Sequence, residues 1–287
     1  MRPTTFKHVQ NMFKHFIREQ KRSIQNTTKH IALDWMIEKE ALDTFFQPII
    51  SLSSGMNLGY EILNRPPQDS VFQSTEAFYD FVGQTEMHGR FEQYCIHLST
   101  KRFSQFSQEL PNGFDTLLFL NIAPQALVQL ENNLKDFEQL LSYHGLLPSQ
   151  VIFEMTEKQE CPDYSVMEKP LITYRKAGFR FAVDDVGSGY NSLKTITVIK
   201  PDFIKLDKSL IRYIDQNLDQ QNMIRLLVNF SQASGSKLVA EGIERPEEIE
   251  YLTAAGIHYG QGYLIGRPAP LLSEGALPIC YSMGNQT

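Results

Sequence analysis

Two neighbouring carboxylates and a lysine on the next predicted strand give the chain its clearest chemical signal. Residues 180–183 form an apolar run that predicts a buried strand, and Asp184 and Asp185 stand where we expect that strand to end. The next apolar run leads to Lys205 and Asp207. Two adjacent carboxylates followed by a lysine suit cation binding and phosphate chemistry. A lone Asp pair also caps turns and helices, so this stretch by itself leaves both interpretations open.

The same construction recurs along the chain, because each predicted strand closes on a polar residue: Glu61, Asn121, Glu154, Asp184 with Asp185, Lys205, Glu241 and Gln261. In a parallel barrel the carboxyl ends of the strands meet at one mouth, where active sites lie. Several carboxylates gathered there would repel one another strongly unless cations lay among them. The donors are oxygens, and no His or Cys spacing typical of a metal site accompanies them, which favours Mg²⁺ or Mn²⁺ over zinc.

The elements that must position these residues alternate between strand-like and helical patterns from Thr44 onward. A tight turn at Ser53–Gly55 predicts that the first two strands are antiparallel. We expect one helix from Pro124 to about Tyr143 and a final strand over Tyr259–Gly266. The tally of about eight strands with helices between most of them predicts an α/β fold and a closed (β/α) barrel.

The N-terminal segment differs from the rest. Residues 1–36 carry apolar residues at helical spacing with lysines and arginines between them, which predicts a basic amphipathic helical extension ahead of a barrel domain over 37–287. We expect Asn26–Thr28 to break the helix before a second short helix over Ile31–Leu42. Such an extension can contact an anionic membrane, bind a partner, or pack on its own domain.

Composition is that of an ordinary globular protein. The chain has 287 residues, 42% of them hydrophobic and 21% charged, and this length suits a barrel of about 250 residues. The net charge of -6 gives no global attraction for a nucleic-acid polymer. Cys95, Cys161 and Cys280 form no CxxC pair, and neither a spanning apolar run nor a signal peptide is evident. These features predict a cytoplasmic protein.

Eight short motifs follow one another between Thr44 and about Pro268. They are Phe46-Gln47-Pro48-Ile49, Glu61-Ile62-Leu63-Asn64-Arg65, Asn121-Ile122-Ala123-Pro124, Glu154-Met155-Thr156-Glu157, Asp184-Asp185-Val186-Gly187-Ser188-Gly189-Tyr190, Ile204-Lys205-Leu206-Asp207, Ala240-Glu241-Gly242-Ile243-Glu244 and Gln261-Gly262-Tyr263. Each motif is weak alone, but the ordered set is specific and resembles the EAL-domain phosphodiesterases. The resemblance implies a modified TIM (β/α)8 barrel, its first strand antiparallel, that hydrolyses the bacterial second messenger cyclic di-GMP to linear pGpG.

The resemblance also implies roles for single residues. Glu241 is similar to a metal ligand or general base, Lys205 would hold the attacking water or the developing charge, and Gln261 would support that water. The implied ligands of two divalent cations, Mg²⁺ or Mn²⁺, are Glu61, Asn121, Glu154, Asp184, Asp185 and Glu241.

The resemblance also implies which residues contact the substrate and which residues hold a loop at the site. The implied substrate contacts are Gln47, Arg65 (through a phosphate) and Asp207. Glu157 is similar to a glutamate that anchors the loop of Gly187 and Gly189, which the family uses for metal organisation and for contact within a homodimer.

Departures from the family pattern spare every charged or coordinating position. Phe46 stands where tyrosine is common, Ala123 where serine is common, and Val186 where phenylalanine is common. Active catalysis is therefore favoured over a degenerate barrel that only binds the nucleotide and signals through a partner. Two further hypotheses are a membrane or scaffold role led by the N-terminal helix, and a different Mg²⁺-dependent barrel acting on carboxylates.

Overall fold

The computed structural model describes residues 3–107, 115–130, 133–156, 164–189, 192–273 and 275–277. The chain forms two compact units, each interrupted in sequence. These two units do not coincide with the domain boundary that the sequence predicts after residue 36, and that boundary stays a prediction. The first unit comprises Met1–Asp43 with Arg65–Phe91, and the second comprises Thr44–Asn64 with Glu92–Thr287.

The first unit is built on one long helix, α1 (Pro3–Glu38), and a short one, α2 (Thr75–Gly83). Near its C-terminal end α1 buries Leu33, Met36 and Ile37. Phe81 of α2 packs edge-on against His30 of α1, with ring centroids 4.9 Å apart. Among the α1 residues whose side chains the structure describes (15–38), the buried ones therefore lie in the last two turns.

The predicted break in the N-terminal helix is wrong, because α1 runs without interruption through residues 26–28. Thr27 Oγ1 donates to the carbonyl of Ser23, and Thr28 Oγ1 donates to that of Ile24, each at 3.0 Å. Both hydroxyls therefore bond to carbonyls one turn earlier in the same helix, a conformation in which threonine is tolerated at helix positions.

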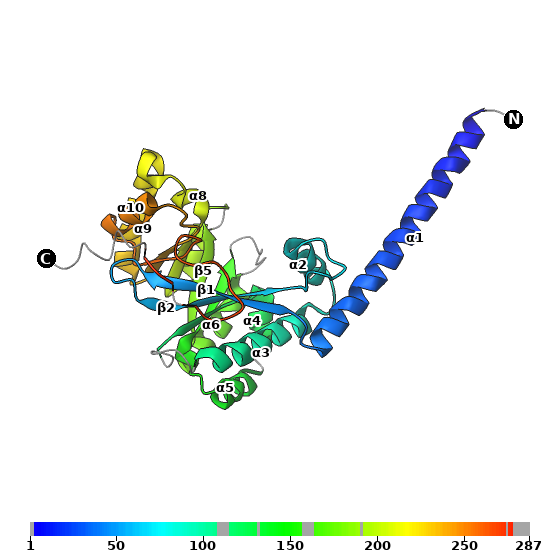
Figure 1. The fold of residues 1–287 in the computed structure, drawn as a ribbon. Coiled ribbons are helices and arrows are strands. Elements are labelled where there is room, and N and C mark those ends of the chain that lie inside the picture. The colour runs from blue at the N-terminus through cyan, green and yellow to red at the C-terminus, as the bar shows by residue number, and fades with distance from the viewer. Residues whose placement is uncertain are drawn as a thin grey trace. The chain divides into compact units, whose positions relative to one another are not determined.

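The second unit is a closed eight-stranded barrel (Figure 1). The strands from β2 to β8 run parallel to one another around the barrel, whereas β1, which closes it, is antiparallel to β8. The amide of Ser51 donates to the carbonyl of Met56 at 2.8 Å across the tight turn to β2, so the predicted antiparallel first strand is confirmed. The strands are β1 (Asp43–Ser51), β2 (Asn57–Arg65), β3 (Leu117–Asn121), β4 (Val151–Thr156), β5 (Arg180–Val186), β6 (Phe203–Leu206), β7 (Lys237–Ala240) and β8 (Tyr259–Gly260).

Helices connect most of the parallel strands. The chain contributes α3 (His88–Ser107), α4 (Pro124–Leu130), α5 (Leu134–Tyr143), α6 (Glu168–Ala177), α7 (Ser192–Ile199), α8 (Lys208–Ile211), α9 (Leu218–Ser234) and α10 (Pro246–Ala254). In the described part of the chain, 3₁₀ turns include Pro148–Gln150, Tyr164–Met167 and Ile214–Gln216. Within the described residues, no helix combines the length and apolar content needed to cross a membrane.

Two expectations about element length need correction. The expected helix over 124–143 is two helices, α4 and α5, and Asn133 before α5 has the non-helical dihedrals φ −113° and ψ 18°. The final strand is only Tyr259–Gly260, because the amides of Ile265 and Gly266 turn back to the carbonyl of Gly262. The short strand places Gln261 directly after the barrel.

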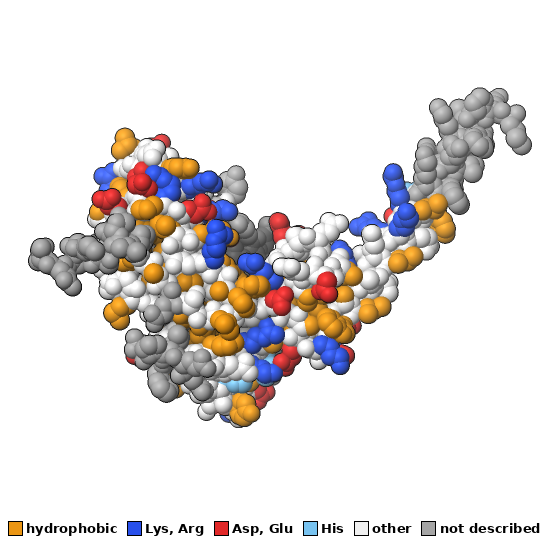
Figure 2. All heavy atoms as spheres, viewed as in Figure 1, with side chains coloured by type: hydrophobic (Ala, Val, Ile, Leu, Met, Phe, Trp, Pro, Cys, Tyr) orange, Lys and Arg blue, Asp and Glu red, His pale blue; other side chains and the backbone are white. Residues whose placement is uncertain are grey.

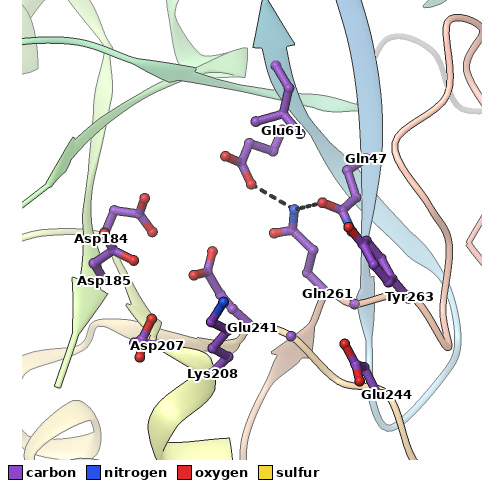
Figure 3. A pocket seen from close by; sticks show the side chains of 13 residues that line it. Gln47, Glu61, Asp184, Asp185, Asp207, Lys208, Glu241, Glu244, Gln261 and Tyr263 are labelled. Atoms are coloured by element: carbon purple, nitrogen blue, oxygen red, sulfur yellow. Dashed lines mark hydrogen bonds between the residues drawn. The ribbon is translucent and has the colours of Figure 1, made fainter. Parts of the chain in front are cut away.

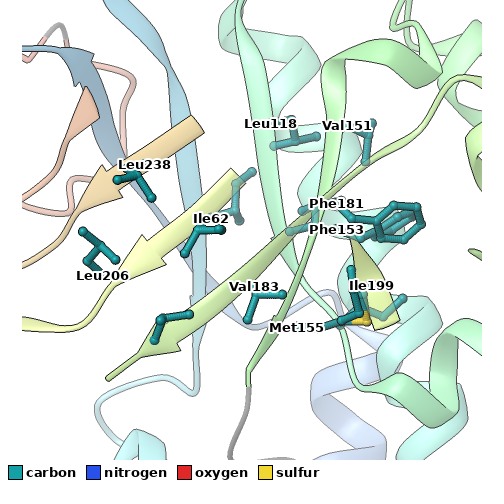
Figure 4. Close-up of a cluster of buried hydrophobic side chains, with 14 of the residues drawn as sticks. Ile62, Leu118, Val151, Phe153, Met155, Phe181, Val183, Ile199, Leu206 and Leu238 are labelled. Atoms are coloured by element: carbon teal, nitrogen blue, oxygen red, sulfur yellow. The ribbon is translucent and has the colours of Figure 1, made fainter. Parts of the chain in front are cut away.

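The core lies on both sides of the strands. Outward-facing side chains such as Leu118, Phe153, Phe181 and Val183 pack beneath the helices (Figure 4). A second buried layer fills the barrel interior and consists of Ile49, Leu117, Phe119, Ile152, Ala182, Phe203 and Val239. Strands buried on both faces explain why the sequence shows continuous apolar runs rather than alternation.

Candidate active site

A pocket of about 550 Å³ opens next to the carboxyl ends of the strands (Figure 3). Its walls come from the second unit alone. Polar and charged side chains dominate the lining, which consists of Gln47, Glu61, Leu63, Asp184, Asp185, Asp207, Lys208, Glu241, Gly242, Glu244, Gln261, Gly262 and Tyr263. The pocket is therefore suited to a polar, charged ligand.

The period of the β-strand carries the charged residues into the barrel. Side chains two positions apart on a strand face the same side. Glu154 follows Ile152 by two positions, and Lys205 follows Phe203 in the same way. The other inward pairs are Phe119 with Asn121, Ala182 with Asp184 and Val239 with Glu241. The apolar interior layer thus forms the floor on which a polar layer lies.

Lys205 is the centre of this polar layer. Its side chain is fully buried, and its ammonium group contacts carboxylates delivered by β2, β4, β5 and the segment after β7. The distances from Lys205 Nζ are 2.7 Å to Glu241 Oε1, 2.9 Å to Glu154 Oε1, 3.1 Å to Glu61 Oε2 and 3.2 Å to Asp184 Oδ1. Four predicted site residues from distant parts of the sequence therefore meet at one cation.

The carboxylates fix the charge of Lys205. Burial alone would lower the pKa of the amine, but the four surrounding carboxylates raise it well above its ordinary value. Burial also works to raise the pKa of Glu61, and here the charge of Lys205 and the amide donors of Gln261 and Asn121 lower it instead. Lys205 and Glu61 are therefore both ionised at neutral pH.

The remaining three carboxylates carry an excess of negative charge. Burial, with the charges of Glu61 and Asp184, raises the pKa of Glu154 well above its ordinary value despite Lys205. Burial and the charge of Asp184 likewise raise the pKa of Glu241 strongly, and the pKa of Asp184 is raised mainly by its own burial. The single ammonium of Lys205 thus does not neutralise all four of the carboxylates around it.

A chain of amide hydrogen bonds orients the other side of the site. Gln261 Nε2 donates to Glu61 Oε2 at 2.7 Å and to Gln47 Oε1 at 3.0 Å (Figure 3). Gln47 Nε2 donates to the carbonyl of Gly266 at 3.1 Å. Asn121 Nδ2 donates to Glu61 Oε1 at 3.3 Å. The predicted Asn121, Gln47 and Gln261 therefore gather around Glu61.

A bulge in β5 brings both adjacent aspartates to the pocket. Successive residues of a regular strand face opposite sides, so Asp184 and Asp185 could not both line one cavity. The β5–β6 register shifts between Val183 and Val186, and Asp185 adopts φ +60°. The strand consequently continues to Val186 instead of ending at Asp184, which corrects the sequence interpretation.

The remaining predicted site residues lie in different places. Asp207 lines the pocket and also caps α8 by accepting a hydrogen bond from the amide of Ser209 at 2.9 Å. Gly187 adopts φ +105°, and a Cβ there would lie 2.4 Å from Leu210, so this loop position requires glycine. Gly189 is exposed in the same loop.

Arg65 ends β2 within the first unit, so its predicted phosphate contact stays a prediction. Glu157 lies outside the described residues.

Several lining residues were assigned no role from the sequence, although Glu244 and Tyr263 stand within two of the motifs identified there. Lys208, Glu244 and Tyr263 each follow a recognised polar residue by one to three positions, a proximity that could have revealed them. The ring of Tyr263 lies 4.2 Å from the guanidinium carbon of Arg267. Gly242 has φ +65°, and a Cβ there would meet the Lys208 side chain at 2.5 Å.

The chemistry of the donors fits a hard divalent cation. They are carboxylate and amide oxygens, and among the described residues Glu154 Oε2 and Gln261 Oε1 are buried without a hydrogen-bond partner. No described group of three or more His, Cys, Asp or Glu side chains is already arranged to hold a metal ion. The carboxylates converge on Lys205 instead, so a bound cation would compete with this ammonium for them.

A family model described as the EAL domain matches residues 31–268. The chain belongs to the EAL domain family. This EAL chain is 29% identical over 244 residues to the "Probable cyclic di-GMP phosphodiesterase PdeB" of Escherichia coli (strain K12), across 84% of this chain and 45% of that protein. It is 28% identical over 223 residues to "Probable cyclic di-GMP phosphodiesterase PdeA" of the same organism, across 74% and 29%. The EAL chain thus spans less than half the length of these relatives.

Solved EAL structures share the barrel. BlrP1 of Klebsiella pneumoniae, in a complex with calcium and cyclic di-GMP, superposes with a TM-score of 0.72 at 28% identity, over 83% of this chain and 59% of that one. A manganese and cyclic di-GMP complex of BlrP1 also gives 0.72, at 29% identity and over the same shares. The EAL enzyme Bd1971 gives 0.77 at 22% identity, over 94% and 73%, and supports the fold alone.

Proposed function

We propose that this EAL chain is a metal-dependent phosphodiesterase that hydrolyses cyclic di-GMP to linear pGpG and so lowers the level of this second messenger in a bacterial cell. The observation that carries the proposal is the convergence of Glu61, Glu154, Asp184 and Glu241 on Lys205 inside an EAL barrel. Support also comes from the names of the relatives and from the cyclic di-GMP complexes of BlrP1.

The pocket fits a substrate of this kind. Its volume of about 550 Å³ lies within the range of roughly 300–1,000 Å³ that is typical of small-molecule sites. Hydrolysis adds water to one phosphorus and breaks the P–O3′ bond, which leaves a 5′-phosphate on the linear product. The reaction needs a proton acceptor for the water and positive charge near the phosphoryl oxygens.

Glu241 and Lys205 are the residues to which we assign these two tasks. The pKa of Glu241 is raised by burial and by Asp184, which brings the carboxylate closer to the basicity that a general base needs. Lys205 keeps its proton and would hold the attacking water or the developing negative charge. Gln261, fixed by Gln47 and Glu61, would orient that water.

The proposed cofactors are two divalent cations, Mg²⁺ or Mn²⁺. The residues that would hold them are Glu61, Asn121, Glu154, Asp184 and Asp185, with Glu241 as a further ligand. When bound, such ions supply charge neutralisation at the phosphate and a lower pKa for water. The calcium and manganese complexes of BlrP1 support divalent ions at this fold, while the number and identity of the ions belong to the proposal.

The compartment we propose is the cytoplasm, which suits a cytoplasmic messenger and unpaired thiols. Cys95 is a free thiol in the structure. Such thiols are typical of reducing compartments.

Product analysis tests the proposal. Purified chain is incubated with cyclic di-GMP and Mn²⁺, and with EDTA in a parallel sample, and the nucleotides are separated by chromatography. We expect linear pGpG with Mn²⁺ and none with EDTA. Calorimetric binding of cyclic di-GMP without any linear product would contradict the enzyme and favour a receptor that acts through a partner.

A further inference from the structure

Glu248 of α10 is a buried carboxylate that lies outside the cluster around Lys205. The residue is 1% exposed, and both of its carboxylate oxygens accept hydrogen bonds from the backbone. Oε1 accepts from the amide of Tyr213 at 2.9 Å, and Oε2 accepts from the amides of Glu244 at 3.0 Å and Arg245 at 3.1 Å. An ionised carboxylate accepts hydrogen bonds and donates none, so it suits a position that faces three N–H donors.

Helix capping accounts for only part of this arrangement. Arg245 is the N-cap of α10, and its bond to Glu248 is one half of a capping box. Glu244 precedes the N-cap, and Tyr213 lies 35 positions before Glu248, between α8 and α9. Glu248 therefore connects the start of α10 to a segment from another part of the second unit.

The connected segments form neighbouring parts of the pocket wall. Residues 207–213 follow β6 and contribute Lys208, and residues 241–245 follow β7 and contribute Gly242 and Glu244 (Figure 3). The two segments touch, because a Cβ added at Gly242 would lie only 2.5 Å from the Cβ of Lys208. The hydrogen bonds of Glu248 therefore hold together two segments that meet at the pocket.

The segment after β7 has two kinds of anchor. The amides of Glu241 and Ile243 each donate at 3.1 Å to a carbonyl in or beside a neighbouring strand of the barrel. The amide of Glu244 donates instead to the carboxylate of Glu248. Loss of Glu248 should consequently displace Glu244 and leave Glu241 in place.

The side chain of Arg245 joins the same two segments near the surface. Tyr213 adopts φ +58°, a left-handed conformation that a residue other than glycine keeps only where its surroundings hold it. The guanidinium carbon of Arg245 lies 4.8 Å from the centroid of the Tyr213 ring, and its Nη1 donates to Asp215 Oδ1 at 2.8 Å. Acidic and basic side chains lie side by side over α8, α9 and α10 (Figure 2). Arg245 thus adds a second contact across the junction that Glu248 forms.

We propose that Glu248 is a positioning residue for substrate binding, which fixes the places of Lys208 and Glu244 in the pocket wall. The inference rests on the proposed function. Lys208 and Glu244 present one positive and one negative group to the pocket, and a few polar groups held in fixed positions determine how a small ligand is oriented. Glu248 itself touches no substrate.

Glu248→Gln tests the proposal. The side chain keeps its shape, but its new NH₂ group must face an N–H donor, so one of the two segments is released. We expect the KM for cyclic di-GMP with Mn²⁺ to rise by about tenfold or more and kcat to change by less than about threefold, because Glu241 and Lys205 stay in place. A role in stability alone would lower the active fraction, and with it the apparent kcat, while KM stayed the same.

Two further variants serve as the control and as a milder test. Gln150 is also buried and closes a capping box, but it lies directly before β4, at the amino end of the strands. Gln150→Ala should therefore leave KM unchanged. Arg245→Ala keeps the backbone amide and removes only the surface contacts, so KM should rise by about two- to fivefold. This variant decides the question if Glu248→Gln does not fold, and an unchanged KM in it would then overturn the proposal.

The unmodified chain is assayed first. Absence of turnover there would contradict the proposed function, and hydrogen exchange of the metal-free chain then tests the positioning separately. The amides of Tyr213 and Glu244 should exchange about tenfold faster or more in Glu248→Gln than in the unmodified chain. Unchanged exchange at both amides would overturn the proposal. Where turnover is present, a KM within about twofold of the unmodified value in both Glu248→Gln and Arg245→Ala would overturn it as well.

Discussion

Lys205 Nζ lies 2.7 Å from Glu241 Oε1, and the lysine side chain is fully buried. Three more carboxylates share the same ammonium. A buried charge pair contributes little net stability, but removal of one partner leaves the other uncompensated. The site therefore depends on Lys205 for stability, in addition to the chemical role that we propose for this lysine.

Lys205→Met tests this dependence. Removal of the ammonium leaves several buried carboxylates without their positive partner, so we expect metal-free protein at neutral pH to lose about 3 to 5 kcal/mol of unfolding free energy. Turnover of cyclic di-GMP should fall at least about 100-fold. Chemical denaturation and product analysis provide the readouts. Lys176→Met, an exposed position on α6, is the matched control, and equal stability of the two variants would refute the central role of Lys205.

Glu241→Gln separates chemistry from binding. The substitution keeps the shape of the side chain and removes its capacity to accept a proton, so turnover should fall by about 100-fold or more while cyclic di-GMP still binds. Single-turnover kinetics and calorimetry measure the two effects. Glu250→Gln, exposed on α10, should behave as the unmodified chain. A Glu241→Gln chain with its rate intact would remove the assignment of the general base.

Asp185 links backbone strain to the site. Its φ of +60° is tolerated by Asn far better than by a β-branched residue. We expect Asp185→Val to cost about 1 to 2 kcal/mol of unfolding free energy and Asp185→Asn much less. Both should weaken Mn²⁺ binding, because both lose a carboxylate. Equal stability of the Val and Asn variants would show that the left-handed conformation is not required.

The pH dependence of stability follows from Glu154. Its pKa in the folded chain is raised above the ordinary value of 4.5, so the folded state binds more protons than the unfolded state in that window. Stability of the metal-free chain should therefore fall as the pH rises from about 4.5 toward the raised value. Glu154→Gln should flatten this slope and stabilise the chain at neutral pH by on the order of 1 kcal/mol. An unchanged slope in thermal denaturation at several pH values would contradict the explanation.

The convergence of the site residues could be predicted from the sequence, because it depends on the two-residue period of side chains along a strand and on the parallel direction of the strands. Glu154 and Lys205 each stand two positions beyond an interior apolar residue, and parallel strands bring such positions to one mouth. The motif order then favours one family. Composition and periodicity alone would have left the barrel chemistry open.

Other features depend on contacts that the sequence does not display. The bulge that turns both Asp184 and Asp185 toward the pocket arises from a register shift between β5 and β6. The continuity of α1 through Thr27 and Thr28, whose hydroxyls donate to carbonyls one turn earlier, is not predicted by local propensity. The central position of Lys205 among four carboxylates was also not predicted, since the resemblance implied only that Lys205 holds the attacking water or the developing charge.

Titration of the metal-free chain with Mn²⁺ in the presence of cyclic di-GMP is the most direct test of whether the gathered carboxylates hold cations. Calorimetry at low temperature should show two Mn²⁺ ions per chain, with at least a tenfold loss of affinity in both Glu154→Gln and Asp184→Asn and none in Glu250→Gln. No binding of Mn²⁺, or the same affinity in all four proteins, would contradict the account.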